Sequence, residues 1–171
     1  MLNPTQLLGL GVTGVSALWL AITWWRFPSR FWIACLSFFL LVHAEIWYSG
    51  RHQLSGLVSS WLQQLGWYSQ RQTPQIAASL LLAAGIVVLG CWWLVRNRSR
   101  ANHLGAGLSI GLLTFLFGLE TVSLHAIDAI LYQRIASVLL IGWLWAVACI
   151  PLWYTLIRHP RPTDVAVRNG D

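Results

Sequence analysis

The stretch that decides the fold is Leu108–Leu131, which reads LSIGLLTFLFGLETVSLHAIDAIL. Its first half is a continuous apolar run, and its second half carries three ionisable side chains, Glu120, His125 and Asp128. A run of about 20 apolar residues is long enough for a helix to cross the hydrocarbon core of a bilayer. Because ionisable groups are costly beside lipid, these three residues mark a candidate functional site.

Four further apolar runs lie on either side of this stretch. They are Leu7–Trp25, Phe31–Tyr48, Ile76–Val95 and Ile135–Ile157. In lipid every backbone amide must find its hydrogen-bond partner inside the chain, so we expect each run to be a helix. Across the chain 57% of the residues are hydrophobic and only 9% are charged, whereas a soluble domain has roughly 25% charged residues. The sequence therefore predicts an all-α integral membrane bundle with five transmembrane helices.

The arginines predict how this bundle is inserted. If the five spans alternate in direction, one side of the membrane carries most of the arginines: Arg26, Arg30, Arg96, Arg98, Arg100, Arg158, Arg161 and Arg168. The other side carries only Arg51, Arg71 and Arg134. Since positively charged loops stay in the cytoplasm, we expect the N-terminus outside and the C-terminus inside, in a bacterial inner membrane or an equivalent membrane. The arginines lie in short turns and form no basic stripe, so the +6 net charge does not indicate nucleic-acid binding.

The longest connection, residues 50–75, contains a different helix signal. Its apolar residues recur at intervals of three or four positions: Leu54, Leu57, Val58, Trp61, Leu62 and Leu65. This spacing predicts one interfacial amphipathic helix between the second and third spans. The helix could simply fill the gap between spans, or it could cover the ionisable residues as a lid. We expect residues 1–158 to form a single bundle and residues 159–171 to be a flexible, polar cytoplasmic tail.

A second group of ionisable residues closes the span Phe31–Tyr48: His43, Glu45 and His52. Because neighbouring spans run in opposite directions, the second and fourth spans should both end on the non-cytoplasmic side. At about 100° per residue, Glu45 and His52 share one helical face, and His125 and Asp128 share another. The depth of Glu120 depends on where its helix ends: about 16 Å below an end at Leu131, or about 6 Å below an end near Leu124.

The first of three interpretations is a structural polar network. Glu45 would pair with Arg51 and Asp128 with Arg134, while the histidines would donate to backbone carbonyls. This interpretation assigns no obvious partner to Glu120 or His43.

The second interpretation is a divalent or redox metal site. Glu45, His52, His125 and Asp128 would be the ligands, since imidazole and carboxylate groups suit zinc, iron, copper or manganese. Glu120 would be the catalytic proton acceptor or an additional ligand. The cysteines lie far apart inside apolar runs, so we expect them to be buried, inert thiols.

The third interpretation uses His43 and His125 as ligands of a haem or a pigment. It suits an alternative function, in which the chain is a non-catalytic accessory subunit of a larger, bioenergetic membrane complex. Its aromatic-rich faces would then bind haem, pigment, quinone or partner helices.

The expected function is therefore that of a small multi-span membrane protein with an outward-facing metal-binding or proton-active site. Its expected partners are the lipid bilayer and, under the accessory-subunit alternative, other membrane subunits, with no role for nucleic acid. The sequence contains no GxSxG, HExxH, phosphate-loop or dinucleotide motif. Whether the protein is an enzyme stays open at this point.

Overall fold

The computed structural model describes residues 3–49, 72–96, 101–122 and 129–158, together with Gln53, Gly56, Leu57, Ser60, Gln63 and Gln64. The main elements of this part are helices: α1 (Pro4–Arg26), α2 (Arg30–Tyr48), α4 (Gln72–Arg96), α5 (Ala101–Val122) and α7 (Leu140–Arg158). Two short strands, β1 (Arg134–Ile135) and β2 (Val138–Leu139), pair antiparallel just before α7. The described part is thus mostly helical, as the sequence predicts.

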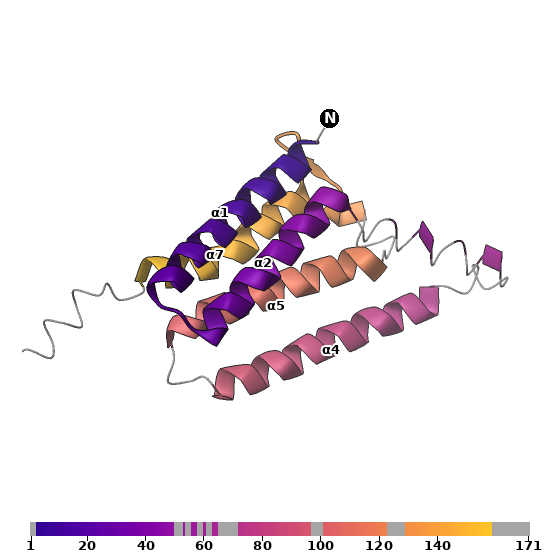
Figure 1. Ribbon diagram of the computed structural model, residues 1–171. Helices are drawn as coiled ribbons and strands as arrows, with labels where there is room; N and C mark the ends of the chain where they lie inside the picture. Colours follow the sequence, from indigo (N-terminus) through magenta and orange to yellow (C-terminus); the bar gives the residue numbers. More distant parts are fainter. Residues whose placement is uncertain are drawn as a thin grey trace, which may run out of the picture.

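The lengths and hydropathies of the helices indicate a membrane protein. Among the described residues, four helices are long and apolar enough to cross a membrane: α1, α2, α5 from His103 to Thr121, and α7. α4 is 25 residues long and runs alongside α5 (Figure 1). Its role as a fifth span and the direction of insertion remain predictions.

Local sequence signals set the ends of α1 and α2. Asn3 caps α1: its side-chain oxygen accepts from the Gln6 backbone N–H at 2.8 Å, and the Gln6 side chain accepts from the Asn3 N–H at 3.3 Å. This reciprocal pair satisfies two backbone donors that a helix start leaves without partners. Ser29 caps α2 by accepting from the Trp32 N–H. With only Phe27, Pro28 and Ser29 between them, the two helices form an antiparallel pair.

The core lies where α1 packs against α2 and α7, and where α7 packs against α5 (Figure 1). Its largest fully buried side chains include Trp145, Phe39, Leu20 and Ile46. Polar side chains also join the helices. Trp153 of α7 donates its indole N–H to the hydroxyl of Ser16 in α1 at 2.9 Å. Such interhelical hydrogen bonds help to hold membrane helices together, because lipid supplies no competing partner.

A proline in α7 creates another bond of this kind. Pro151 has no N–H and interrupts the backbone hydrogen bonding of the helix. The next N–H, that of Leu152, donates at 2.9 Å to the buried hydroxyl of Ser109 in α5. One turn earlier in α5, a Cβ on Gly105 would collide with the carbonyl oxygen of Pro151 and the hydroxyl of Thr155. The backbones of α5 and α7 therefore approach closely because α5 has small residues at this crossing.

Two predicted span boundaries were wrong. α5 begins at Ala101 and not at Leu108, and it is described as far as Val122. α7 begins at Leu140 and not at Ile135. Residues 134–139 form the β1–β2 hairpin instead, with left-handed backbone angles at Ala136 and Ser137 that reverse the chain. Hydropathy reports whether a residue suits an apolar environment, and Ile135 and Val138 suit a strand as well as a helix.

Part of the predicted architecture lies outside the described residues. In the amphipathic segment, Gln53, Gly56, Leu57, Ser60, Gln63 and Gln64 are helical, and its other residues are not described. The predicted tail, residues 159–171, is not described either.

Candidate functional site

The ends of α2 and α5 meet at one polar cavity of about 140 Å³. α1 contributes its first turn to the cavity, and α7 contributes its first two turns. We call this space the Glu120 cavity; its lining residues are Asn3, Thr5, Gln6, Ser49, Glu120, Tyr132, Leu139, Ile141 and Trp145. The second and fourth predicted spans thus end at the same end of the bundle, and residues from both contribute to a single site.

Glu120 is the ionisable group of this cavity. It lies in the last turn of α5, and only 4% of its surface is exposed. Below it, the rings of Phe117 and Trp145 stack in parallel with their centroids 5.5 Å apart, and Trp145 also lines the cavity. A carboxyl group enclosed in this way is strongly disfavoured in its charged form unless polar groups or a cation compensate it.

Neutral polar side chains line the same cavity. The Gln6 side-chain amide donates to the Ser49 hydroxyl at 3.2 Å, and the Leu139 N–H donates to the Thr5 hydroxyl at 2.9 Å. Since both hydroxyl oxygens act as acceptors in these bonds, each keeps its own hydrogen to donate. Tyr132 adds a third hydroxyl to the lining. Among the described lining residues there is no arginine or lysine.

The size and polarity of the cavity suit water. A space of about 140 Å³ with polar walls exceeds the volume that a buried water molecule needs. Waters held by hydroxyls and a carboxyl group form the kind of hydrogen-bonded chain along which protons move. The arrangement is therefore chemically able to bind and release a proton at Glu120.

The border of the Glu120 cavity is conformationally strained. In the described part of the chain, the non-glycine residues with positive φ are Ser49 (53°), Ala136 (51°) and Ser137 (69°). Ser49 lines the cavity, while Ala136 and Ser137 form the turn of the hairpin whose residue Leu139 lines it. Left-handed backbone costs about 1–2 kcal/mol for a non-glycine residue. Strain of this kind is common at functional sites, where surrounding contacts hold it in place.

The structure places His43 and Glu45 away from the cavity lining. The Nδ1 atom of His43 lies 2.9 Å from the hydroxyl of Thr13, and this hydroxyl also lies 2.8 Å from the Gly9 carbonyl, to which it donates. The Thr13 hydroxyl therefore lies between the Gly9 carbonyl of its own helix and the His43 ring. His43 therefore joins α2 to α1 within the bundle. Glu45 is half-buried on α2 and is not a lining residue.

His52, His125 and Asp128 lie outside the described residues. Of the predicted metal ligands, the structure therefore describes Glu45 alone. In the part of the chain that it describes, no group of three or more His, Cys, Asp or Glu residues is placed to hold a metal ion. Cys35 and Cys149 are buried and free, as expected.

Sequence reasoning missed the neutral members of the site: Asn3, Thr5, Gln6 and Ser49. It searched for ionisable groups, whereas these residues act through amides and hydroxyls. The signal for two of them is present in the sequence, because Asn3-Pro4-Thr5-Gln6 has the form of a helix start with a reciprocal cap. No short motif indicates that this helix start lies beside Glu120.

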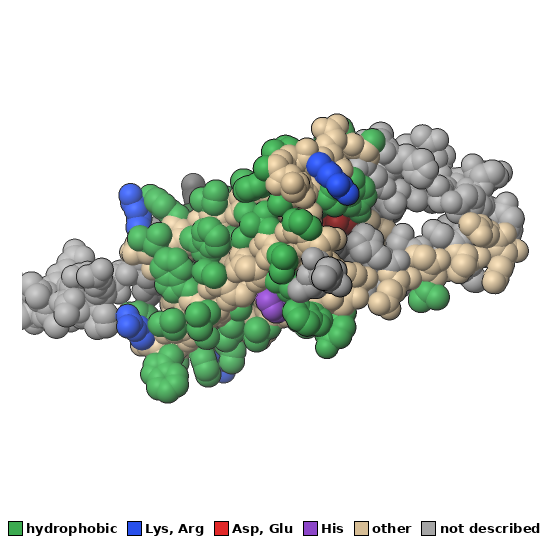
Figure 2. Space-filling view, turned by 90° about the horizontal axis from the view of Figure 1, so that it is seen from above, with side chains coloured by type: hydrophobic (Ala, Val, Ile, Leu, Met, Phe, Trp, Pro, Cys, Tyr) green, Lys and Arg blue, Asp and Glu red, His purple; other side chains and the backbone are tan. Residues whose placement is uncertain are grey.

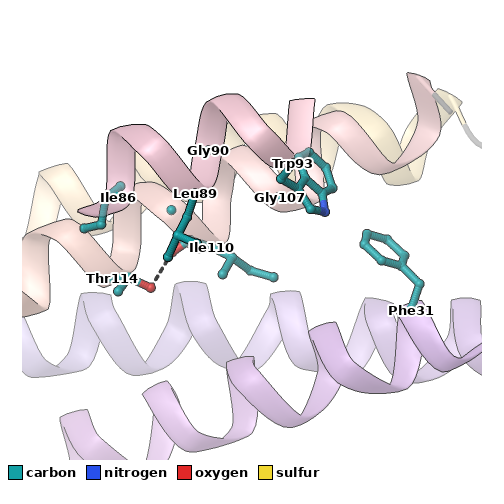
Figure 3. Close-up of a pocket in the computed structure, with 9 residues that line it drawn as sticks. Phe31, Ile86, Leu89, Gly90, Trp93, Gly107, Ile110 and Thr114 are labelled. Carbon is teal, nitrogen blue, oxygen red and sulfur yellow. Dashed lines mark hydrogen bonds between the residues drawn. The ribbon is translucent and has the colours of Figure 1, made fainter. Parts of the chain in front are cut away.

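A second cavity, of about 310 Å³, is an apolar groove between α4 and α5. Figure 3 shows Trp93 of α4 and Phe31 of α2 at one end of this α4–α5 groove, with Thr114 toward the other end. The Thr114 hydroxyl donates to the Ile110 carbonyl of its own helix. Gly90 and Gly111 leave space in the groove, since a Cβ added to either would meet nothing within 4 Å.

Comparisons of the chain with family models, with curated proteins and with solved structures found no match. Its function is therefore inferred from the residues of its cavities.

Proposed function

We propose that this multi-span membrane protein has a proton-active site, in which Glu120 binds and releases a proton on the non-cytoplasmic side. The observation that carries the proposal is the burial of Glu120, 4% exposed, in a cavity lined by neutral polar side chains. A carboxyl group with no function is rarely placed so close to the hydrocarbon core.

The surroundings of Glu120 support both of its protonation states. Burial favours the neutral acid, whereas hydroxyl groups that donate hydrogen bonds favour the carboxylate. Ser49 and Thr5 line the same cavity, and each retains a hydroxyl hydrogen, since both oxygens already accept from another group. A site with both kinds of support can change its protonation state without rearrangement of the helices.

The distribution of arginine supports the proposed sidedness. Arg26, Arg30 and Arg158 lie at the ends of helices opposite to the Glu120 cavity. The described arginine nearest to the cavity in sequence is Arg134, in the β1–β2 hairpin. The end with more arginines is the cytoplasmic one by the positive-inside rule, which directs Glu120 outward.

Carbodiimide labelling tests the proposal. Dicyclohexylcarbodiimide is apolar and reacts with protonated carboxylic acids, so it should modify Glu120 faster as the pH is lowered. Peptide mass spectrometry of the labelled protein identifies the modified residue, and Glu120→Gln should remove the label. The proposal fails if Glu120 stays unmodified across the pH range while the half-buried Glu45 is labelled.

A metal site is the second candidate, and the convergence on one cavity favours it. Ser49 and Glu120 both line the Glu120 cavity. In the sequence His52 comes three residues after Ser49, and His125 and Asp128 come five and eight residues after Glu120. We propose that these three residues would be the ligands together with Glu45, which lies on α2 outside the cavity lining, with Glu120 as proton acceptor. Elemental analysis of protein purified without chelators should then find near-stoichiometric metal, which His125→Ala removes. Metal-free protein would exclude this candidate.

The accessory-subunit alternative is supported by the α4–α5 groove. Its volume of about 310 Å³ is at the lower end of the range for small-molecule sites. The aromatic side chains Phe31 and Trp93 suit a planar, lipid-soluble ring such as that of a quinone. Visible and ultraviolet absorption of protein purified in mild detergent tests this alternative, since bound quinone, haem or pigment each has a distinct spectrum. A spectrum of aromatic amino acids alone would contradict it.

A further inference from the structure

We infer that an anionic phospholipid binds at the end of the bundle opposite to Glu120, with its phosphate on Arg158. A cavity of about 620 Å³ lies there between α5 and α7. We call it the Arg158 cavity; the residues that matter here are Leu104, Gly105, Ile150, Pro151, Tyr154 and Arg158.

The Arg158 cavity is amphipathic in the way a phospholipid requires. Leu104, Ile150 and Pro151 form an apolar part, and Ile150 is largely exposed toward the outside of the bundle. In the charged part of the cavity, the guanidinium carbon of Arg158 lies 4.4 Å from the centre of the Tyr154 ring. This cation–π contact restrains the guanidinium group at the end of α7. An acyl chain fits against the apolar part while the phosphate meets the arginine.

A guanidinium group recognises phosphate better than it recognises most anions. Its planar N–H groups can donate two parallel hydrogen bonds to a pair of phosphate oxygens. The described lining of the cavity contains no acidic residue that would compete for these donors. The Arg158 cavity therefore has a positive charge available at the level where lipid headgroups lie.

The shape of the cavity is fixed by tight packing beneath it. Gly105 touches α7 so closely that a Cβ would collide with Pro151 and Thr155. The Thr155 hydroxyl donates to the Pro151 carbonyl at 2.9 Å, and Ser109 accepts from the Leu152 N–H one turn deeper. The floor is thus held by two hydrogen bonds and a backbone contact, and the lipid would meet a preformed surface.

The charge around the cavity favours an acidic lipid over a zwitterionic one. Arg26 at the end of α1 and Arg30 at the start of α2 lie at the same end of the bundle as Arg158. Figure 2 shows arginine side chains at this end of the molecule, as well as beside the acidic side chain toward the other end. Basic residues near a membrane surface attract anionic lipid in general. The cavity would hold the lipid at one defined position, which a general attraction does not do.

The experiment compares two lipids in the full-length protein. Phosphatidylglycerol and phosphatidylcholine with identical acyl chains are titrated into protein in a neutral detergent, and thermal unfolding is followed at each concentration. We expect phosphatidylglycerol to raise the Tm at concentrations where phosphatidylcholine does not. In Arg158→Gln the apparent affinity for phosphatidylglycerol should fall about tenfold.

Two further variants distinguish binding at the Arg158 cavity from a non-specific attraction of the lipid to positive charge. Arg26→Gln removes the same charge from the same end but lies outside the cavity lining. Its affinity should stay within about twofold of the unmodified chain, since an exposed charge outside the site acts only through a screened attraction. Ile150→Trp fills the apolar part without changing the charge and should weaken binding as Arg158→Gln does. The inference is overturned if both arginine variants lose affinity equally, if the two lipids act alike, or if inorganic phosphate stabilises the protein as much as phosphatidylglycerol.

Discussion

The two ends of the bundle are formed by the same helices but hold opposite kinds of cavity. At one end Glu120 is 4% exposed inside a space of about 140 Å³ lined by hydroxyls and amides. At the other end Arg158 is exposed at the edge of a space of about 620 Å³. A long arginine side chain can reach the headgroup layer by itself, whereas a short carboxyl side chain cannot. The protein therefore has to build polar surroundings for Glu120, and those surroundings are what indicates a function.

The largest expected loss of stability comes from a substitution at the end of the bundle that holds Arg158. Gly105→Val would force α5 away from α7, since even a Cβ at this position meets Pro151 and Thr155. Overpacking at such a contact should cost about 3 kcal/mol or prevent folding. Thermal unfolding in detergent measures the loss. Gly111→Val in the same helix is the matched control, because a Cβ there meets nothing within 4 Å. Equal stability of the two variants would contradict the close approach of α5 and α7.

A smaller loss is expected at the hydrogen bond beneath the Arg158 cavity. Ser109→Ala would leave the Leu152 N–H without its acceptor in a fully buried position. An unsatisfied buried donor costs about 1–3 kcal/mol. Chemical unfolding of the variant would give the difference in free energy. Thr114→Ala serves as the control, because its hydroxyl is exposed and bonds only within α5, so its removal should have almost no effect.

At the other end, a gain in stability is expected from the strained hairpin. Ser137 has a φ of 69°, which glycine adopts without steric cost. Ser137→Gly should therefore stabilise the protein by about 1 kcal/mol. Ser137→Ala keeps the unfavourable backbone and should give no gain. If both variants have the same unfolding temperature, the positive φ at this position stores no strain.

The smallest expected effect on stability concerns Glu120 itself. Glu120→Gln keeps the size and hydrogen-bonding groups of a neutral acid. The free energy of unfolding should therefore fall by less than about 1 kcal/mol, or the unfolding temperature should rise. A large loss of stability would indicate that the carboxylate is held by a bound cation or a charged partner. That outcome would favour the metal site over the proton-active site.

Much of the helical architecture could be predicted from apolar runs and turn residues. The first predicted span ends at Trp25 and the second begins at Phe31, each within one residue of the corresponding end of α1 or α2. The start of α5 was missed because Ala101 to Gly107 is less apolar, although His103 packs there with its ring centre 3.9 Å from that of Phe31. That contact comes from tertiary packing, which a hydropathy pattern does not report.

The candidate site could be predicted only in part. Glu120 stood out because an acid in an apolar run is costly, and its cavity lies where the ends of α2 and α5 meet. The neutral residues Thr5, Gln6 and Ser49 could not be found in this way, since hydroxyls and amides are common in any turn. His43 was predicted to bind a cofactor, and the structure gives it a hydrogen-bond partner in Thr13. Its role as a cofactor ligand stays a prediction.

Infrared spectroscopy during a pH titration tests the central proposal most directly. A protonated carboxylic acid has a carbonyl stretch that is separate from the amide bands and disappears when the acid ionises. We expect a pH-dependent carbonyl band in the unmodified protein that is absent from Glu120→Gln and retained in Glu45→Gln. A band that is unchanged by Glu120→Gln, or a spectrum with no pH-dependent acid at all, would contradict a proton-active Glu120.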